Sequence, residues 1–326
     1  MPDFSAFVPE THQNISSGYV ETLIQARREE LFTGLMRLRY PGGEHLVFTF
    51  LEGIQQKLYR CSDNTMEVLP RHTWFYALDH PDASVGFLSL PVEAMRFTRV
   101  AYEAPVIHME QSTYSREELM ECAGRWSVEA EPGIVHLQCD PWDRYYLIAG
   151  HTTPIIEELS MANGRPNFSI SDATFPQSLP NGRYQVARYI SNCEHEVWRE
   201  YELRLAFGPL MRMLLNRFSE LAGRVLTERL CVQLSLWTRE EGWNISITSN
   251  GAVNRHYFDS LESAIGVYLD LLRRFREEAS PAIGSRMVDT ISREILNKLD
   301  PYRRELLTQY LYSQFGVGSI SGVVWR

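Results

Sequence analysis

Two stretches of the sequence, residues 34–53 and 133–152, repeat one pattern at a spacing of 99 residues. In the first, apolar side chains fall at every second position on both sides of Gly42-Gly43, which predicts two antiparallel strands joined by a tight turn. In the second, residues 140–143 (DPWD) replace the glycines as turn formers. The aligned positions are Gly34 with Gly133, Met36 with Val135 and Leu38 with Leu137. The repeat therefore predicts two related hairpins.

A helix is expected before each hairpin. In the first copy, apolar residues from Val20 to Leu31 follow Ser16-Ser17 at helical spacing. In the second, Ser115 and Glu118 have the S-x-x-E spacing of a capping box, and Leu119 to Trp126 continue with an apolar helical face. Helix and hairpin together predict a tandem duplication of a small α+β domain.

The third part of the chain has a different pattern. A helical stripe begins at Pro209 and is followed by three expected strands, at residues 232–236, 243–247 and 253–257. One helix follows, and two more are expected to start at Ser280-Pro281 and Asp300-Pro301, because proline is favoured in the first helical turn. The whole chain is thus predicted to be α+β. Its expected domains are residues 1–105, 106–203 and 204–326.

Charge and composition narrow the class of protein. A net charge of −9 without a dense Lys/Arg run argues against nucleic-acid binding. No apolar run reaches the roughly 20 residues of a membrane-spanning helix, and the start of the chain lacks the pattern of a signal peptide, so a cytoplasmic location is expected. The cysteines are odd in number and widely spaced, which predicts free thiols: Cys61, Cys122, Cys139, Cys193 and Cys231.

Catalytic motifs give little support for an enzyme. The sequence contains no phosphate-binding glycine loop, no G-x-S-x-G and no H-E-x-x-H. One cluster carries groups that could bind a metal or act as a nucleophile: His136, Cys139, Asp140 and His151. His136 and Cys139 are three positions apart, so a regular strand directs them to opposite faces, which favours a structural role. No cofactor, metal or catalytic residue is predicted.

Aromatic residues supply the candidate binding positions. Strand alternation turns either Tyr145 or Tyr146 outward, next to Trp142. Core packing of this cluster is the preferred interpretation, and a partner-binding surface is the alternative, because large amphipathic rings are favoured at protein interfaces. Trp325 in the C-terminal tail is a further docking candidate. The third module offers another hypothesis, an apolar ligand pocket lined by Trp237, Trp243 and Tyr257.

The strings ARREELFTGLMRLR, residues 26–39, and HLVFTFLEGI, residues 45–54, resemble the PATAN-like domains (PatA N-terminal type) of bacterial signalling proteins. Those domains have a helix, a G-x-L-x-L strand and a strand of the form L-x-F-x-x-G-x-I. The matching positions are Gly34, Met36, Leu38, Val47 or Phe48, Gly53 and Ile54. The second copy departs from the pattern, because Thr152-Thr153 stand where the first has Gly53-Ile54.

The resemblance implies a non-catalytic adaptor in bacterial signal transduction or motility that acts through protein contacts. The partner is expected to be a protein, with a response regulator and a small GTPase as the candidates. The predicted function is accordingly a regulatory or scaffold protein that acts through protein-protein contacts. Two alternatives stay open: a small-molecule sensor with an apolar pocket in the C-terminal module, and an unrecognised hydrolase or metal enzyme. Homo-oligomerisation is also left open.

Overall fold

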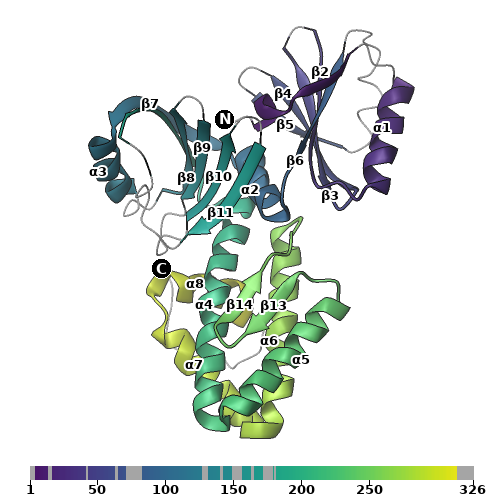
Figure 1. The fold of residues 1–326 in the computed structure, drawn as a ribbon. Helices are drawn as coiled ribbons and strands as arrows, with labels where there is room; N and C mark the ends of the chain where they lie inside the picture. The colour runs from purple at the N-terminus through teal and green to yellow at the C-terminus, as the bar shows by residue number, and fades with distance from the viewer. Residues whose placement is uncertain are drawn as a thin grey trace. The chain divides into compact units, whose positions relative to one another are not determined.

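A computed structural model describes residues 4–13, 17–41, 43–62, 65–70, 83–126, 131–139, 142–148, 156–162, 165–171, 179 and 181–313 of the chain. The chain divides into two compact units, Met1–Trp198 and Arg199–Arg326, referred to below as unit 1 and unit 2. Unit 1 is built from two antiparallel sheets with helices, and unit 2 is largely helical (Figure 1). The predicted α+β class is confirmed.

Sheet A is a six-stranded antiparallel sheet in the order β1-β6-β2-β3-β4-β5. Its strands are β1 (Glu10–Gln13), β2 (Gly34–Arg39), β3 (His45–Leu51), β4 (Ile54–Ser62), β5 (Thr65–Leu69) and β6 (Ser84–Ser89). A short helix, η1 (Phe4–Phe7), precedes β1; α1 (Ser17–Glu29) precedes β2, and α2 (Val92–Glu103) follows β6. The first predicted hairpin is the β2-β3 pair.

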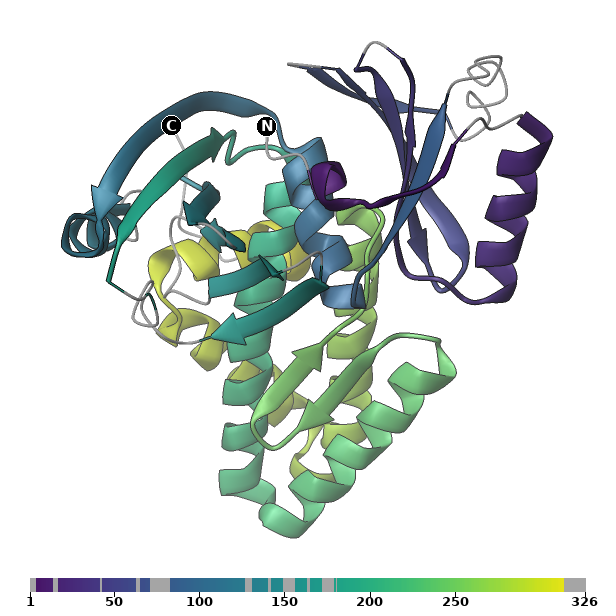
Figure 2. The same ribbon diagram turned by 45° about the horizontal axis from the view of Figure 1, so that its top comes forward.

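Sheet B has the same topology. Its order, read from the opposite end, is β7-β12-β8-β9-β10-β11. Its strands are β7 (Val106–Ser115), β8 (Gly133–Cys139), β9 (Trp142–Ile148), β10 (Ile156–Ala162), β11 (Arg165–Ser171) and β12 (Arg183–Ser191), with α3 (Arg116–Trp126) before β8 and α4 (Glu196–Ala222) after β12. The second predicted hairpin is the β8-β9 pair. Each strand of sheet A, and each of α1 and α2, therefore has a counterpart in the same chain order in sheet B (Figure 2).

The aligned glycines, Gly34 and Gly133, serve the same purpose in both sheets. A Cβ on Gly34 would lie 2.0 Å from the carbonyl oxygen of Leu88, and a Cβ on Gly133 would lie 2.3 Å from that of Tyr189. In each sheet that carbonyl belongs to the residue just before the glycine's cross-strand partner. Gly34 also has a φ of +147°, which L side chains rarely adopt. Close backbone approach thus explains why glycine begins both hairpins.

One face of each sheet, here called the helix face, packs against the helix that precedes the hairpin. In sheet A, Met36 and Leu38 share a core with Val20 and Leu23 of α1. In sheet B, the aligned positions share a core with α3, whose members are Leu119, Cys122, Ala123 and Trp126. The other face of each sheet is called the second face below. Alternation along the strands decides which side chains it receives.

The predicted capping box at the start of α3 is confirmed. The Ser115 backbone N–H donates to Glu118 Oε2 at 2.8 Å, and the Glu118 N–H donates to Ser115 Oγ at 3.3 Å. These hydrogen bonds lower the pKa of the Glu118 carboxyl, because they favour its charged form. The box fixes the point at which β7 ends and α3 begins.

Unit 2 contains the rest of α4, α5 (Arg224–Glu240), a hairpin of β13 (Ile245–Thr248) and β14 (Gly251–Asn254), α6 (Leu261–Ile283), α7 (Ser285–Lys298), α8 (Pro301–Leu307) and the π-helical η3 (Thr308–Tyr312). One core joins these elements; it includes Phe207, Leu234, Tyr268 and Ile291. Asp300 caps α8 as predicted, because its Oδ1 accepts a hydrogen bond from the Arg303 N–H at 3.0 Å.

The predicted three-stranded meander is wrong in its first strand, because residues 232–236 lie in α5. Its third strand, predicted at residues 253–257, is displaced and forms instead at Gly251–Asn254. The alternating Val232 and Leu236 are exposed, at 58% and 50%. The buried residues of α5 instead recur at helical spacing: Thr227, Leu230, Cys231, Leu234 and Thr238. The helix expected to start at Pro281 is also displaced. Pro281 lies within α6, and the break falls at Gly284, whose φ is +85°.

Four cysteines have described side chains, and all are free thiols as predicted: Cys61, Cys122, Cys193 and Cys231. Burial raises the pKa of the Cys231 thiol and keeps it protonated. No helix within the described ranges is both long and apolar enough to span a membrane. The three-domain division stays a prediction; its first boundary falls between α2 and β7, and its second falls inside α4.

Candidate functional site

The two tyrosines proposed for partner binding are both buried, each at 3% exposure. Tyr146 faces α3 in the helix-face core, and Tyr145 is covered on the second face by Phe4, with ring centroids 4.6 Å apart. The expectation that alternation leaves one ring outward is therefore wrong, because the sheet is covered on both sides at this point. The side chain of Trp142 and all of Trp325 lie outside the described residues.

Of the three residues hypothesised to line a ligand pocket in the third module, two lie next to each other. Trp237 and Trp243 pack edge to face with centroids 5.0 Å apart, and both lie against the unit 2 core. Tyr257 is buried, at 8% exposure. The two indoles thus cover one another's surface, and a ligand pocket at these residues stays a prediction.

The hypothesised metal cluster is only partly described. Asp140 and His151 lie outside the described residues, as does the side chain of Cys139. His136 Nε2 lies 2.8 Å from Asp143 Oδ1, and its ring stacks on Tyr145 with centroids 4.2 Å apart. Over the part of the chain that the structure describes, no group of three or more His, Cys, Asp or Glu side chains is arranged to hold a metal ion. The His136 ring is instead held by Asp143 and Tyr145 of the neighbouring strand β9.

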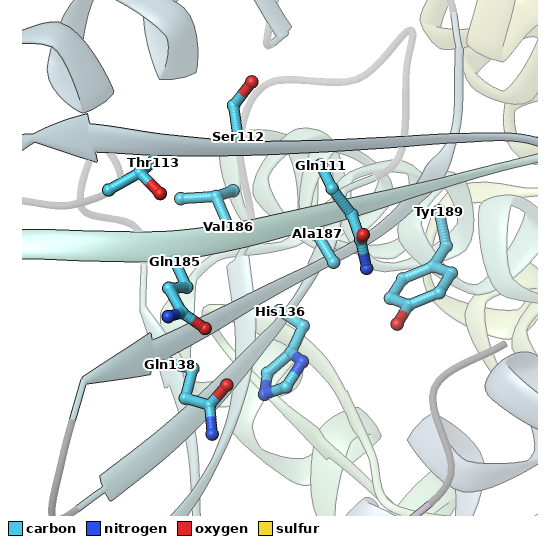
Figure 3. A pocket seen from close by; sticks show the side chains of 9 residues that line it. All are labelled: Gln111, Ser112, Thr113, His136, Gln138, Gln185, Val186, Ala187 and Tyr189. Carbon is cyan, nitrogen blue, oxygen red and sulfur yellow. The ribbon is translucent and has the colours of Figure 1, made fainter.

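A hollow of about 490 Å³ lies on the second face of sheet B, across β7, β12 and β8. Its lining consists of Gln111, Ser112, Thr113, His136, Gln138, Gln185, Val186, Ala187 and Tyr189. Figure 3 shows Ala187 between Gln111 and His136, and the side chains of Gln138, Gln185 and Tyr189 on the same side of the strands. This volume is in the range of known ligand sites.

The strand registers explain why the hollow forms. Ala187 of β12 is paired with Gln111 of β7 on one side and with His136 of β8 on the other. In the next row, Gln185 lies between Thr113 and Gln138. Residues opposite one another on adjacent strands share a face. A methyl group thus lies between two long polar side chains, so Ala187 forms the floor and the polar residues form the walls.

The lining is rich in neutral hydrogen-bonding groups. Each glutamine amide offers two donors and an acceptor. A carboxylate only accepts hydrogen bonds, so the His136 ring donates to Asp143 through Nε2. In the tautomer that carries its hydrogen on Nε2, Nδ1 is an acceptor. Burial raises the pKa of Tyr189, which keeps its hydroxyl protonated at neutral pH. The hollow is suited to a ligand that both donates and accepts hydrogen bonds.

An exposed edge strand borders the hollow. β7 is the last strand of sheet B, and of the described strands only β12 pairs with it. It spans ten residues, and its residues 107–113 are exposed. The apolar side chains of Ile107 and Met109 are 66% and 43% exposed. Along its outer side, the N–H and C=O groups of alternate residues are open to a further strand.

Sequence reasoning missed Gln111, Gln185 and Ala187. A weak signal was present, because Gln111 and Thr113, and likewise Gln185 and Ala187, alternate with residues of the helix face. The sequence did not show that these pairs lie on neighbouring strands. Comparisons of the chain with protein-family models, curated proteins and solved structures find no match.

Proposed function

We propose that this chain is a non-catalytic regulatory or scaffold protein of bacterial signalling, and that it binds a partner protein at the second face and outer edge of sheet B. The observation that carries the proposal is the hollow beside β7, lined by neutral polar side chains and bordered by an exposed edge strand. A polypeptide both donates and accepts hydrogen bonds along its length, as this surface requires.

The edge of β7 supports the same proposal. Long exposed edge strands pair readily with other chains, and many recognition domains bind partners by adding a strand to such an edge. Burial of Ile107 and Met109 would contribute about 25 cal/mol for each Å² of apolar surface removed from water. Main-chain pairing would provide affinity, and the hollow would provide selectivity.

The PATAN-like resemblance in residues 26–54 suggests the biological setting. It favours a cytoplasmic response regulator or small GTPase as the partner, and the shared topology of the two sheets favours an origin by tandem duplication. The second copy then carries the binding surface, although the resemblance itself lies in the first.

Affinity purification with a double variant, Ile107→Lys and Met109→Lys, tests this function. Lysines on an exposed edge oppose strand addition, so the variant should lose a partner that the parent chain retains. Val68→Lys is the matched control, because Val68 is 48% exposed on β5, the edge strand of sheet A. Partner recovery that is equal for all three proteins would contradict the proposal.

A second candidate function is the sensing of a small neutral molecule, because the volume of the hollow suits one. Thermal unfolding of the parent chain across a panel of neutral metabolites tests it. A ligand that raises the midpoint of the parent chain and leaves an Ala187→Leu variant unchanged would support sensing. The same response in both proteins would place the ligand elsewhere.

A further inference from the structure

The place in sheet A that corresponds to the hollow is filled by the chain itself. The segment Phe4–Pro9, here called the N-terminal segment, leads into β1. Arg37 donates a hydrogen bond from its guanidinium to the Val8 carbonyl oxygen at 2.8 Å. A Cβ on Gly86 would lie 1.9 Å from the Pro9 carbonyl oxygen. η1 lies against β2, and Val8 Cγ1 would lie 2.8 Å from the same Cβ on Gly86 of β6. The N-terminal segment thus crosses this face from β2 to β6, and Val8 is 2% exposed.

The strand registers make this place equivalent to the hollow. Gly34 pairs with Ser89, and three positions further along the same two strands Arg37 pairs with Gly86. In sheet B, Gly133 pairs with Ile190, and three positions further along His136 pairs with Ala187. Gly86 therefore corresponds to Ala187, and Arg37 corresponds to His136. In both sheets these residues lie on the second face.

Among the described residues, no segment crosses β12 and β8 in this way, and the linkage between the two copies explains why. Residues 4–9 precede β1, whereas only Ala104 and Pro105 separate α2 from β7. Two residues span at most about 7 Å, too little to cross two strands that lie about 4.8 Å apart and return to the edge. The N-terminal segment and α2 lie over β9 and β10 on this face. There the Phe4 ring packs on Tyr145, and Arg96 donates a hydrogen bond to Glu157.

We infer that the hollow of sheet B binds an extended segment of a partner protein, which crosses β12 and β8 as the N-terminal segment crosses β6 and β2. The inference rests on the proposed function and names the chemistry of the partner. The bound element is main chain, and its amide groups pair with the side chains of Gln111, Gln138 and Gln185. The interaction differs from strand addition, because the segment crosses the face of the sheet.

The lining also restricts the sequence of the partner segment. The described residues of the lining include no Asp, Glu, Lys or Arg, and the Asp143 carboxylate beside them already accepts a hydrogen bond from His136, so the walls favour an uncharged segment. Ala187 has the methyl group that Gly86 lacks, so the main chain must lie further from the floor than Pro9 does. A small residue over Ala187 satisfies this spacing, because in sheet A the side chain next to Gly86 is that of Val8.

Selection from a displayed random-peptide library on the full chain tests the inference, with calorimetric titration of the enriched peptides. Ala187→Leu should weaken peptide binding by at least about tenfold, because the larger side chain fills the floor. Ala187→Gly should keep or increase the affinity. Ala162→Leu is the control, because Ala162 is exposed at the end of β10 in the same sheet. Circular dichroism verifies that each variant is folded.

Hydrogen exchange then locates the bound peptide. Protection of amides in residues 109–113 and 185–189 supports the inference. A library that yields no peptide dependent on Ala187 overturns it, and so does protection confined to unit 2. If the chain associates with itself and Ala187→Leu abolishes this association, the inference is overturned, because the hollow then binds a second copy of the chain. A partner lost with the β7 double variant and kept by Ala187→Leu would support the proposed function and overturn this inference alone.

Discussion

Sheet A and sheet B share one strand order, one glycine position and one helix-covered face, yet their second faces differ. In sheet A, Val47, Tyr59 and Leu35 are at most 1% exposed beneath the residues that cover this face. In sheet B, Gln111, Gln138 and Gln185 are exposed. The second face of one and the same sheet topology can therefore be covered or exposed, depending on the segment that precedes the edge strand.

The helix between the two copies contributes to both sheets. On one side of α2, Glu103 accepts hydrogen bonds from Arg99 at 3.3 Å and from Tyr59 of sheet A at 2.8 Å. On the other side, Arg96 pairs with Glu157 of sheet B at 3.4 Å, with side chains 5% and 3% exposed. A helix buried in this way is expected to make the two sheets unfold together.

The largest expected effect comes from Arg96→Met. Removal of one partner from a buried ion pair leaves the Glu157 carboxylate in a site of low polarity, so the free energy of unfolding should fall by about 3 kcal/mol. Urea unfolding followed by fluorescence and by circular dichroism would measure it. Two separated transitions in the variant would indicate that Arg96 holds the two sheets in one cooperative unit.

Arg224→Met is the control for this change. Arg224 pairs with Glu228 at 2.7 Å, but it is 88% exposed, and such surface pairs contribute less than about 1 kcal/mol. Equal losses in Arg96→Met and Arg224→Met would mean that the buried pair has no special role between the sheets.

Gly86→Ala should have the next largest effect on the free energy of unfolding, because it disturbs the N-terminal segment that covers the second face of sheet A. The new Cβ would collide with the Pro9 carbonyl, and either the N-terminal segment or β6 must move, at a cost of about 2 kcal/mol. Hydrogen exchange at Val8 should become faster. Ala187→Gly, the reverse change in sheet B, should cost only roughly 0.5–1 kcal/mol from glycine entropy. Unchanged exchange at Val8 would mean that the segment does not depend on close approach to Gly86.

Local patterns were sufficient to predict the repeat. The alternation around Gly42-Gly43 and the spacing from Gly34 to Gly133 depend only on neighbours in the chain, and so does the Ser115-Glu118 box. These features specify two hairpins and their helices. A further local signal was overlooked: Arg99–Glu103 (RVAYE) and residues 198–202 (WREYE) align at the same 99-residue spacing, in α2 and α4.

The remaining features depend on contacts between distant parts of the chain. Val232 and Leu236 alternate as in a strand, but the burial of Leu230 and Leu234 against the unit 2 core selects a helix. Tyr145 is buried by Phe4, far away in sequence. The hollow needs Gln111, Ala187 and His136 side by side, and their strands are separated by α3 and by the rest of sheet B. Sequence periodicity alone contains none of these pairings.

Alkaline pH offers a smaller test that compares the two sheets directly. Burial raises the pKa of Tyr40 in sheet A and of Tyr146 in sheet B to about 12, from an ordinary value of 10. A raised folded-state pKa contributes stability that is present below pH 10 and is lost as pH rises from 10 to 12. Tyr40→Phe and Tyr146→Phe should each reduce this loss, by up to about 1.4 kcal/mol per pH unit. Denaturant unfolding at several pH values measures the slopes, and parallel slopes in parent and variant would contradict the burial of that tyrosine.

Asp143→Asn should lower the free energy of unfolding by about 1 kcal/mol, and it tests the wall of the hollow. The carboxylate accepts from His136 Nε2 and thereby fixes the ring tautomer, whereas an amide can either accept or donate. Nitrogen-15 NMR of the His136 ring should show one tautomer in the parent chain and a mixture in the variant. Peptides selected on the parent chain should bind the variant more weakly, because Nδ1 is no longer always an acceptor. A single unchanged tautomer would mean that Asp143 does not set it, and the ring's orientation would then be assigned to its stacking on Tyr145.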